Sequence, residues 1–222
     1  MKSKFLLALA LAFFSNQASA LDQDFQQWSM IVLQGNVTEN WRGYLEIQPR
    51  WSGDTPSQDR LIIRPAAVYT LSSEVSLWAG YAAIETFSPS ISWENRGWQQ
   101  IQYEKNFGGI ILINRTRFEE RFLATENDVS FRLREMVRTL IPFSDDKTWA
   151  IVFSDEIFIN LNTVSATNQA GFDQNRAFAG INYMFNPSIR FEAGYMNNFV
   201  NLPENLPDRM NHIFLFSTTF NF

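Results

Sequence analysis

Long segments of this chain alternate between apolar and polar residues with a period of two, and this pattern favours strands over helices. Residues 41–51 show it best, because the odd positions read Trp, Gly, Leu, Ile, Pro, Trp while the even positions read Arg, Tyr, Glu, Gln, Arg. Residues 189–199 repeat the pattern. Successive side chains of a strand point to opposite faces, so each segment predicts a strand with one apolar and one polar face.

Eleven segments carry this alternation, and most have ten or more residues, about twice the usual length of a soluble strand. They are residues 25–35, 41–51, 60–70, 74–84, 95–104, 109–122, 128–142, 148–159, 173–184, 188–199 and 210–222. About ten tilted residues are what a strand needs to cross a bilayer. The chain after residue 20 has no run of 18 apolar residues, so a membrane-spanning form must be a closed barrel.

The connections between the segments alternate in length. Short ones are residues 36–40, 71–73, 143–147 and 185–187, and longer ones are residues 52–59, 85–94, 160–171 and 200–209. Short turns at one end and long loops at the other are the plan of outer-membrane barrels. The sequence therefore predicts an all-β fold, an antiparallel transmembrane outer-membrane β-barrel of 10–12 strands. Bacterial single-chain barrels have an even strand number, which favours ten or twelve, with a missed strand or a first segment outside the wall.

The N-terminus has the three parts of a secretory signal peptide. Lys2 and Lys4 form a basic region, residues 5–14 are apolar, and Ala18-Ser19-Ala20 is a cleavage motif. We expect residues 1–20 to be a signal peptide and residues 21–222 to be a single β-barrel domain. The expected location is the outer membrane of a Gram-negative bacterium.

The last segment ends in alternating aromatic residues, Phe214, Phe216, Phe220 and Phe222. A final strand with a terminal Phe resembles the membrane-assembly signal of bacterial outer-membrane barrels. Its expected partners are outer-membrane lipid and the barrel-assembly machinery. An ordinary soluble edge strand is the other interpretation, but a long apolar edge would promote aggregation in water.

If the Phe222 face contacts lipid, alternation predicts an arginine-rich lumen. Twelve arginines fall on the inward faces: Arg42, Arg50, Arg60, Arg64, Arg115, Arg117, Arg121, Arg132, Arg134, Arg138, Arg176 and Arg190. Five glutamates join them: Glu46, Glu104, Glu119, Glu156 and Glu192. A hairpin near residue 125 would set the arginines of 115–121 opposite those of 132–138, and a turn at 144–146 would set Glu156 opposite Arg134.

This lumen has two interpretations. Rings of arginine line anion pores, so the excess of positive charge predicts a channel or binding site for small anionic solutes. Alternatively, the arginines pair with Glu, Gln and Tyr to fill a narrow barrel. Glu135 and Asp155 fall on the lipid face by strict alternation, so we expect a bulge or a register error near them.

Composition excludes several other functions. The chain has no cysteine and one histidine, so it has no disulfide, thiolate zinc site, cysteine nucleophile or multi-histidine metal site, and no metal or cofactor is predicted. A net charge of −5 gives no indication of nucleic-acid binding. His212 shares the outward face of Phe214, whereas Ser217 has the opposite parity and cannot partner it along the strand. Catalysis is therefore not expected; a lipid hydrolase using His212 is the weaker alternative.

Several stretches together resemble an uncharacterised bacterial envelope family, domain-of-unknown-function family 2490. They are Trp41 and residues 43–46 with Arg50-Trp51, Leu77-Trp78-Ala79-Gly80-Tyr81, residues 114–122 (NRTRFEERF), Arg132-Leu133-Arg134, Glu156-Ile157-Phe158, Asn175-Arg176 with Gly180, Gly194-Tyr195 and Asn211-His212. The resemblance covers residues 24–222 and implies an outer-membrane β-barrel without an assigned activity.

Three functions follow as hypotheses. The first is a channel or binding barrel for small anions that uses the arginine rows. The second is a non-conducting structural or surface-interaction barrel that uses the loops at residues 160–171 and 200–209. The third, less favoured, is a lipid-modifying enzyme at the rim near His212.

Overall fold

Eleven strands are present in the part of the chain that the computed structural model describes, residues 21–222 without 54–57, 89 and 204–205. They are β1 (Asp22–Asn36), β2 (Trp41–Ser52), β3 (Gln58–Thr70), β4 (Val75–Thr86), β5 (Ser92–Phe107), β6 (Ile110–Leu123), β7 (Ser130–Pro142), β8 (Trp149–Asn160), β9 (Gly171–Asn186), β10 (Ile189–Val200) and β11 (Arg209–Asn221). The predicted signal peptide lies outside the described residues. Within them, no helix has the length and apolarity to cross a membrane.

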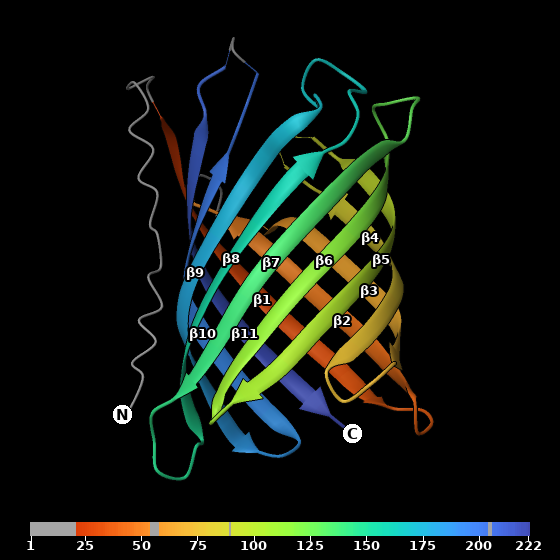
Figure 1. Ribbon diagram of the computed structural model, residues 1–222. Helices are drawn as coiled ribbons and strands as arrows, with labels where there is room; N and C mark the ends of the chain where they lie inside the picture. Colours follow the sequence, from red (N-terminus) through yellow and green to blue (C-terminus); the bar gives the residue numbers. More distant parts are fainter. Residues whose placement is uncertain (1–20, 54–57, 89, 204–205) are drawn as a thin grey trace, which may run out of the picture.

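The strands form one closed barrel in which each pairs with its neighbours in sequence, and β1 pairs with β11 (Figure 1). Consecutive strands are antiparallel, whereas β1 and β11 are parallel from Asp22↔Arg209 to Gln34↔Asn221. The expectation of an even strand number was therefore wrong, and the first segment is a wall strand. A parallel ladder pairs the backbone N–H and C=O groups of both edge strands, as an antiparallel ladder does. A barrel with an odd number of strands can therefore also close.

The two ends of the barrel differ as predicted. In Figure 1 the short turns lie at the end where the chain terminates, and the longer loops lie at the other end. We call these the turn end and the loop end. Gly108-Gly109 forms a two-residue turn in which both residues have positive φ, at +63° and +108°, and the Gly109 amide donates to the Asn106 side chain. Glycine adopts this backbone without a steric penalty.

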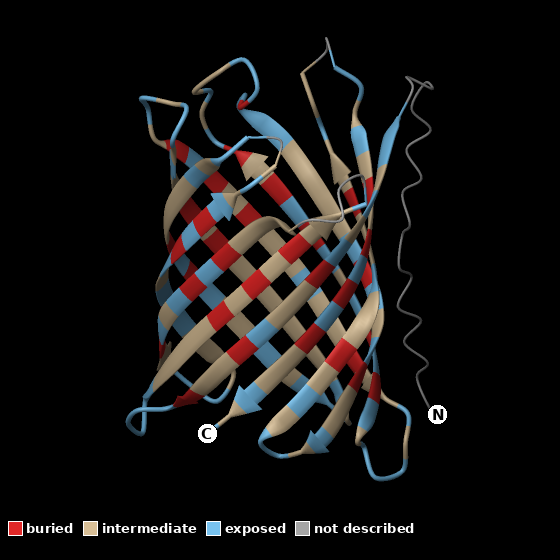
Figure 2. Cartoon of the chain, turned by 180° about the vertical axis from the view of Figure 1, so that it is seen from behind, coloured by how far each residue is buried: buried red, intermediate tan, exposed pale blue. Residues whose placement is uncertain are grey.

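Burial alternates along the strands, as Figure 2 shows. On β11, Phe214, Phe216 and Phe220 are exposed on the outer wall, while Ile213 and Leu215 are buried inside. The outward face of the C-terminal phenylalanines was therefore predicted correctly. Exposed aromatic side chains gather near both ends of the wall: Phe25, Trp93, Phe122, Phe131 and Phe172 toward the loop end, and Trp41, Phe107, Phe143, Trp149 and Phe185 toward the turn end.

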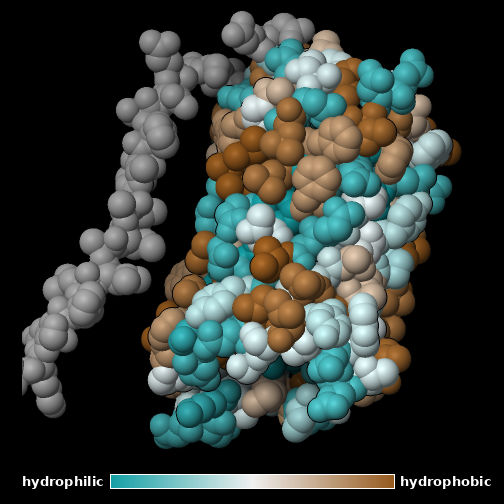
Figure 3. All heavy atoms as spheres, turned by 45° about the vertical axis from the view of Figure 1, so that its right-hand side comes forward, coloured by the Kyte–Doolittle hydropathy of each residue, from teal (hydrophilic) through white to brown (hydrophobic). Residues whose placement is uncertain are grey.

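Polar groups interrupt the apolar outer wall, which Figure 3 shows as a mixture of apolar and polar patches. Glu135 and Asp155 do face outward, and the ladders β6–β7 and β7–β8 carry no register shift beside them, so the expected bulge is absent. Glu135 accepts hydrogen bonds from Asn114 Nδ2 at 2.5 Å and Thr116 Oγ1 at 2.6 Å. Asp155 accepts one from Asn175 Nδ2 at 2.9 Å. These neighbours compensate for the charges on the wall.

The barrel interior also contains an apolar core that alternation alone did not predict. One cluster comprises Trp28, Leu140, Ala150, Val152, Phe178, Ile213 and Leu215, with Ile111, Ile113 and Met196 packed against it. A second comprises Val68, Trp78, Ala82 and Trp98, with Tyr44 and Ala66. Together the two clusters take side chains from all eleven strands. The inside of the barrel is thus a packed core as well as a polar lumen.

Candidate functional site: an arginine-rich interior and its vestibule

The densest charges lie on β6 and β7, whose inward rows face each other as predicted. Arg117 is the direct cross-strand partner of Arg134, and Glu119 is the partner of Arg132. Like charges directly opposite each other destabilise a sheet unless other groups compensate. Glu119, only 1% exposed, supplies that compensation.

Glu119 is the centre of the ion-pair network. Its Oε2 accepts hydrogen bonds from Arg132 Nε at 3.0 Å and Nη2 at 2.6 Å, and its Oε1 accepts one from Arg134 Nη1 at 2.6 Å. Arg96 Nη1 lies 3.5 Å from Oε2, and Arg117 Nη1 lies 4.0 Å from Oε1. Charge-assisted bonds of this kind are among the strongest in proteins. The Glu119 carboxylate thus lies within ion-pair distance of arginines from three strands, β5, β6 and β7.

Glu156 forms the second junction. Arg134 donates to its Oε1 from Nε at 2.9 Å, and Arg115 Nη2 donates to the same oxygen at 2.5 Å. The predicted contact between Glu156 and Arg134 is present, but the predicted register was wrong, because Arg134 pairs with Phe158 and Glu156 pairs with Met136. The β7–β8 turn is longer than the sequence suggested, and it includes Lys147 with φ of 58°. The Glu156–Arg134 contact is therefore diagonal.

Alternation missed a third junction near the loop end. Glu94 accepts hydrogen bonds from Arg96 Nε and Arg121 Nε, both at 2.6 Å. Glu94 fell outside the predicted segment 95–104, because β5 begins earlier, at Ser92. Arg96 lies on the same inward face of β5 as Gln100. Its inward position was the sequence signal that could have identified the Arg96–Glu94 pair. Asp173 of β9 was also missed, and it accepts a bond from Arg132 Nη1 at 3.1 Å.

The other predicted lumen residues divide into paired and exposed groups. Arg64 Nη1 donates to Glu46 Oε1 at 2.6 Å, and Arg138 forms an ion pair with Glu192. Arg42 lies over the Trp78 ring at 5.6 Å. Glu104 and Arg190 lie at the turn end, where both are exposed and outside this network. Ion pairs with glutamates and a contact with an aromatic ring therefore engage Arg64, Arg138 and Arg42.

Above this network a vestibule of about 750 Å³ opens toward the loop end. Nine arginines and five carboxylates are among its lining residues. Arg50, Arg60 and Arg176 line it without forming an ion pair to any carboxylate in the described part of the chain. Arg50 donates to Gln48 Oε1 at 2.6 Å, and Arg176 donates to Gln174 Oε1 at 3.0 Å. The Nε of Arg60 has no described partner.

Trp28 fixes two of these arginines. The Arg50 guanidinium carbon lies 3.5 Å from the Trp28 ring centroid, and that of Arg176 lies 5.1 Å from it. A ring face attracts a cation but does not neutralise it. The vestibule therefore presents positive charge on a rigid support.

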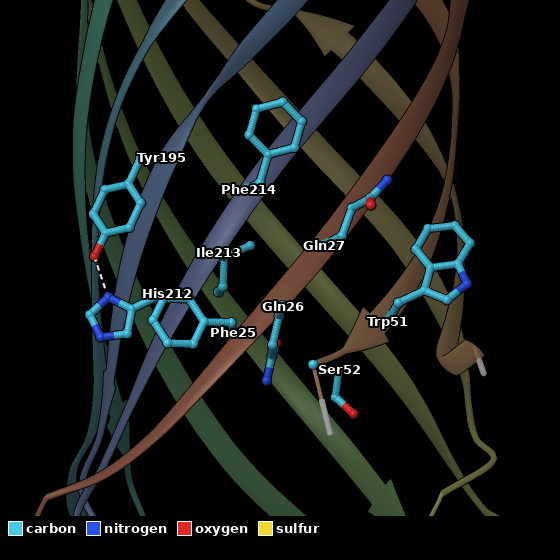
Figure 4. Close-up of a pocket in the computed structure, with 10 residues that line it drawn as sticks. Phe25, Gln26, Gln27, Trp51, Ser52, Tyr195, His212, Ile213 and Phe214 are labelled. Atoms are coloured by element: carbon cyan, nitrogen blue, oxygen red, sulfur yellow. Dashed lines mark hydrogen bonds between the residues drawn. The ribbon is translucent and has the colours of Figure 1, made fainter. Parts of the chain in front are cut away.

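His212 is on the outer wall, as its parity predicted, in a groove of about 610 Å³ at the β1–β11 seam (Figure 4). Its Nδ1 lies 2.6 Å from the Tyr195 hydroxyl, and its ring stacks on Phe25 at a centroid distance of 4.9 Å. Ser217 is buried on the inward face. Groups of three or more His, Cys, Asp or Glu that could hold a metal ion are absent from the described residues.

The fold and interior define a class: a closed eleven-stranded β-barrel whose lumen is filled by an arginine–glutamate network. The chain belongs to the family described as protein of unknown function DUF2490, whose model matches residues 25–211. It is 34% identical over 199 residues to a protein of Methylorubrum extorquens strain AM1 described as uncharacterized, and the match covers 86% of each chain. No solved structure matches the chain significantly.

Proposed function

We propose that this protein is an outer-membrane barrel that binds small anionic solutes in its vestibule. The observation that carries the proposal is a set of three arginines, Arg50, Arg60 and Arg176, that line the same vestibule. None of the three forms an ion pair with a described carboxylate. A cation removed from water is costly unless an opposite charge compensates it. Guanidinium groups are suited to bind carboxylate or phosphate through two parallel hydrogen bonds.

The packed interior favours binding over conduction. Trp98, Phe158, Val152 and Ile213 are each at most 1% exposed inside the barrel. Side chains from every strand contribute to the two apolar clusters inside the barrel. The aromatic residues at both ends of the outer wall support a membrane location, because outer-membrane barrels carry such girdles at both interfaces. The expected partners are outer-membrane lipid and, through β11, the barrel-assembly machinery.

The test is a calorimetric titration of the refolded chain, residues 21–222, with inorganic phosphate and citrate. We expect saturable binding that falls about tenfold in the variant Arg50→Gln/Arg60→Gln, the loss that corresponds to about 1.4 kcal/mol. Arg190→Gln is the matched control, because it removes an exposed arginine at the turn end. Absence of binding to the folded barrel would contradict the proposal.

A planar-bilayer recording under a potassium chloride gradient tests the channel alternative. We expect no steady conductance from the packed interior. Steady anion-selective channels, whose preference shifts toward cations when Arg117 and Arg134 are charge-reversed, would favour the channel instead. The loop-mediated surface barrel would be favoured by a binding partner that is lost when residues 160–171 are deleted.

A further inference from the structure

The vestibule and the groove on the outer wall meet at the loop end of the β1–β2 ladder. Gln26 and Ser52 are the last partners of that ladder and line both hollows. Gly53 follows at the edge, and a Cβ there would lie 2.3 Å from the Phe25 carbonyl oxygen. The edge that separates the two hollows is therefore narrow and carries no side chain at Gly53.

The groove is mainly apolar and carries no fixed charge. Phe25, Trp51 and Phe214 form its apolar surface, and Gln27 and His212 contribute polar groups (Figure 4). None of its ten lining residues, all of them described, is Lys, Arg, Asp or Glu. Phe214 continues along β11 into the exposed phenylalanines of the outer wall. This surface is suited to a hydrocarbon chain and offers no counter-ion to a charged head.

The counter-ions lie just inside the edge. Arg50 is two residues from Ser52 on the same face of β2, a distance of about 7 Å along the strand. Arg60 is the direct ladder partner of Arg50. Among the described residues, Gln26 and Ser52 thus lie between the apolar surface and these two cations, neither of which forms an ion pair with a described carboxylate.

We propose that the two hollows form one site for an anionic lipid. Its hydrocarbon chain lies in the outer groove against Phe25, Trp51 and Phe214, and its anionic head reaches Arg50 and Arg60 over the Gln26–Ser52 edge. An amphiphile alone satisfies both halves, because a soluble anion leaves the groove uncovered and a neutral lipid leaves the arginines uncompensated. This inference rests on the proposed anion binding in the vestibule and names its ligand class.

The test is native mass spectrometry of the refolded barrel in neutral detergent with dilauroyl phosphatidic acid or dilauroyl phosphatidylcholine. We expect phosphatidic acid to be retained about tenfold more than phosphatidylcholine. Retention should fall about tenfold in Arg50→Gln/Arg60→Gln and in Phe25→Ala/Trp51→Ala. Phe153→Ala/Trp149→Ala is the matched control, since it removes an exposed Phe and an exposed Trp from β8, away from the groove.

A second measurement uses the unmodified chain, so it does not depend on folding of the variants. Octyl phosphate should bind about tenfold more tightly than methyl phosphate in the same titration. Equal affinities for octyl phosphate and methyl phosphate would overturn the proposal of a joint site. Lipid retention that is unchanged by the arginine substitutions would also overturn it. If the joint lipid site is contradicted but inorganic phosphate still binds in an Arg50-dependent way, the proposed anion binding in the vestibule is retained. If inorganic phosphate does not bind either, both proposals fall.

Discussion

Arg117 and Arg134 are direct partners in the β6–β7 ladder, yet their guanidinium groups donate hydrogen bonds to different acceptors. Arg117 donates to Gln100 Oε1 at 2.7 and 2.9 Å and lies over Trp98 at 4.1 Å. Arg134 donates to Glu119 and Glu156. Two like charges can thus occupy one rung because Gln100 of β5 accepts from Arg117, while Glu119 of β6 and Glu156 of β8 accept from Arg134.

Replacing Glu119 by Gln should destabilise the barrel strongly. The substitution removes the carboxylate that Arg132 and Arg134 share, and breaking a buried ion pair on one side costs about 3–5 kcal/mol. Urea unfolding of the refolded barrel in lipid vesicles measures the loss. Glu120→Gln, the next residue on the outer face, should change stability by less than about 1 kcal/mol. Equal effects of the two variants would contradict the central role of Glu119.

Gly80 should not tolerate a methyl group. A Cβ there would lie 2.4 Å from the buried Trp98 ring and 2.7 Å from the Pro65 carbonyl oxygen, a backbone atom. We expect Gly80→Ala to cost about 1–3 kcal/mol in the same unfolding measurement, as overpacking does. Gly43→Ala is the control, since its nearest neighbour is Val37 Cγ2 at 3.7 Å. A neutral Gly80→Ala would show that Trp98 moves freely.

The parallel closure can be tested with introduced cysteines, because the native chain has none. Ser29 and Phe216 are register partners across β1 and β11. Ser29→Cys/Phe216→Cys should form a disulfide in the folded barrel, visible as a mobility shift on a non-reducing gel. Ser29→Cys/Thr218→Cys, displaced by two residues, should cross-link far less. The reverse preference would mean a different register or an open seam.

The terminal Phe222 should matter more for assembly than for stability. Its ring is exposed, although its amide donates to the Gln34 carbonyl at 3.0 Å. We expect Phe222→Ala to lower the amount of folded barrel in the outer membrane of cells while refolding in detergent continues. Phe107→Ala, another exposed aromatic at the turn end, is the comparison. Unchanged cellular assembly would remove the assembly role predicted for this residue.

Sequence periodicity predicted the wall well, because strand alternation is a local property. All eleven segments became strands, and the inward faces of Arg117, Glu119 and Arg134 were correct. Register was harder to predict, because it depends on turn conformation. Two extra residues between the paired ends of the β7–β8 turn moved Glu156 from the partner of Arg134 to a diagonal position.

The apolar half of the interior could not be predicted from alternation. Trp98 shares its inward face with Arg96 and Phe158 shares its inward face with Glu156, so a rule that predicts a polar lumen from alternation assigns these two aromatic residues no role. They are buried because arginine side chains stack on them: Arg117 over Trp98 at 4.1 Å and Arg134 over Phe158 at 4.4 Å. A closed barrel was predicted, but the parallel pairing of β1 with β11 was not, because an even number of strands was expected.

The odd strand count has a consequence for where the ends of the barrel emerge. β1 starts at the loop end and β11 finishes at the turn end, so the chain enters and leaves the wall on opposite sides (Figure 1). In a barrel with an even number of strands both ends share one compartment. In the proposed membrane location, a peptide fused ahead of Asp22 and one fused after Phe222 would face different aqueous spaces. The same molecule could therefore carry a label to each side of the membrane at once.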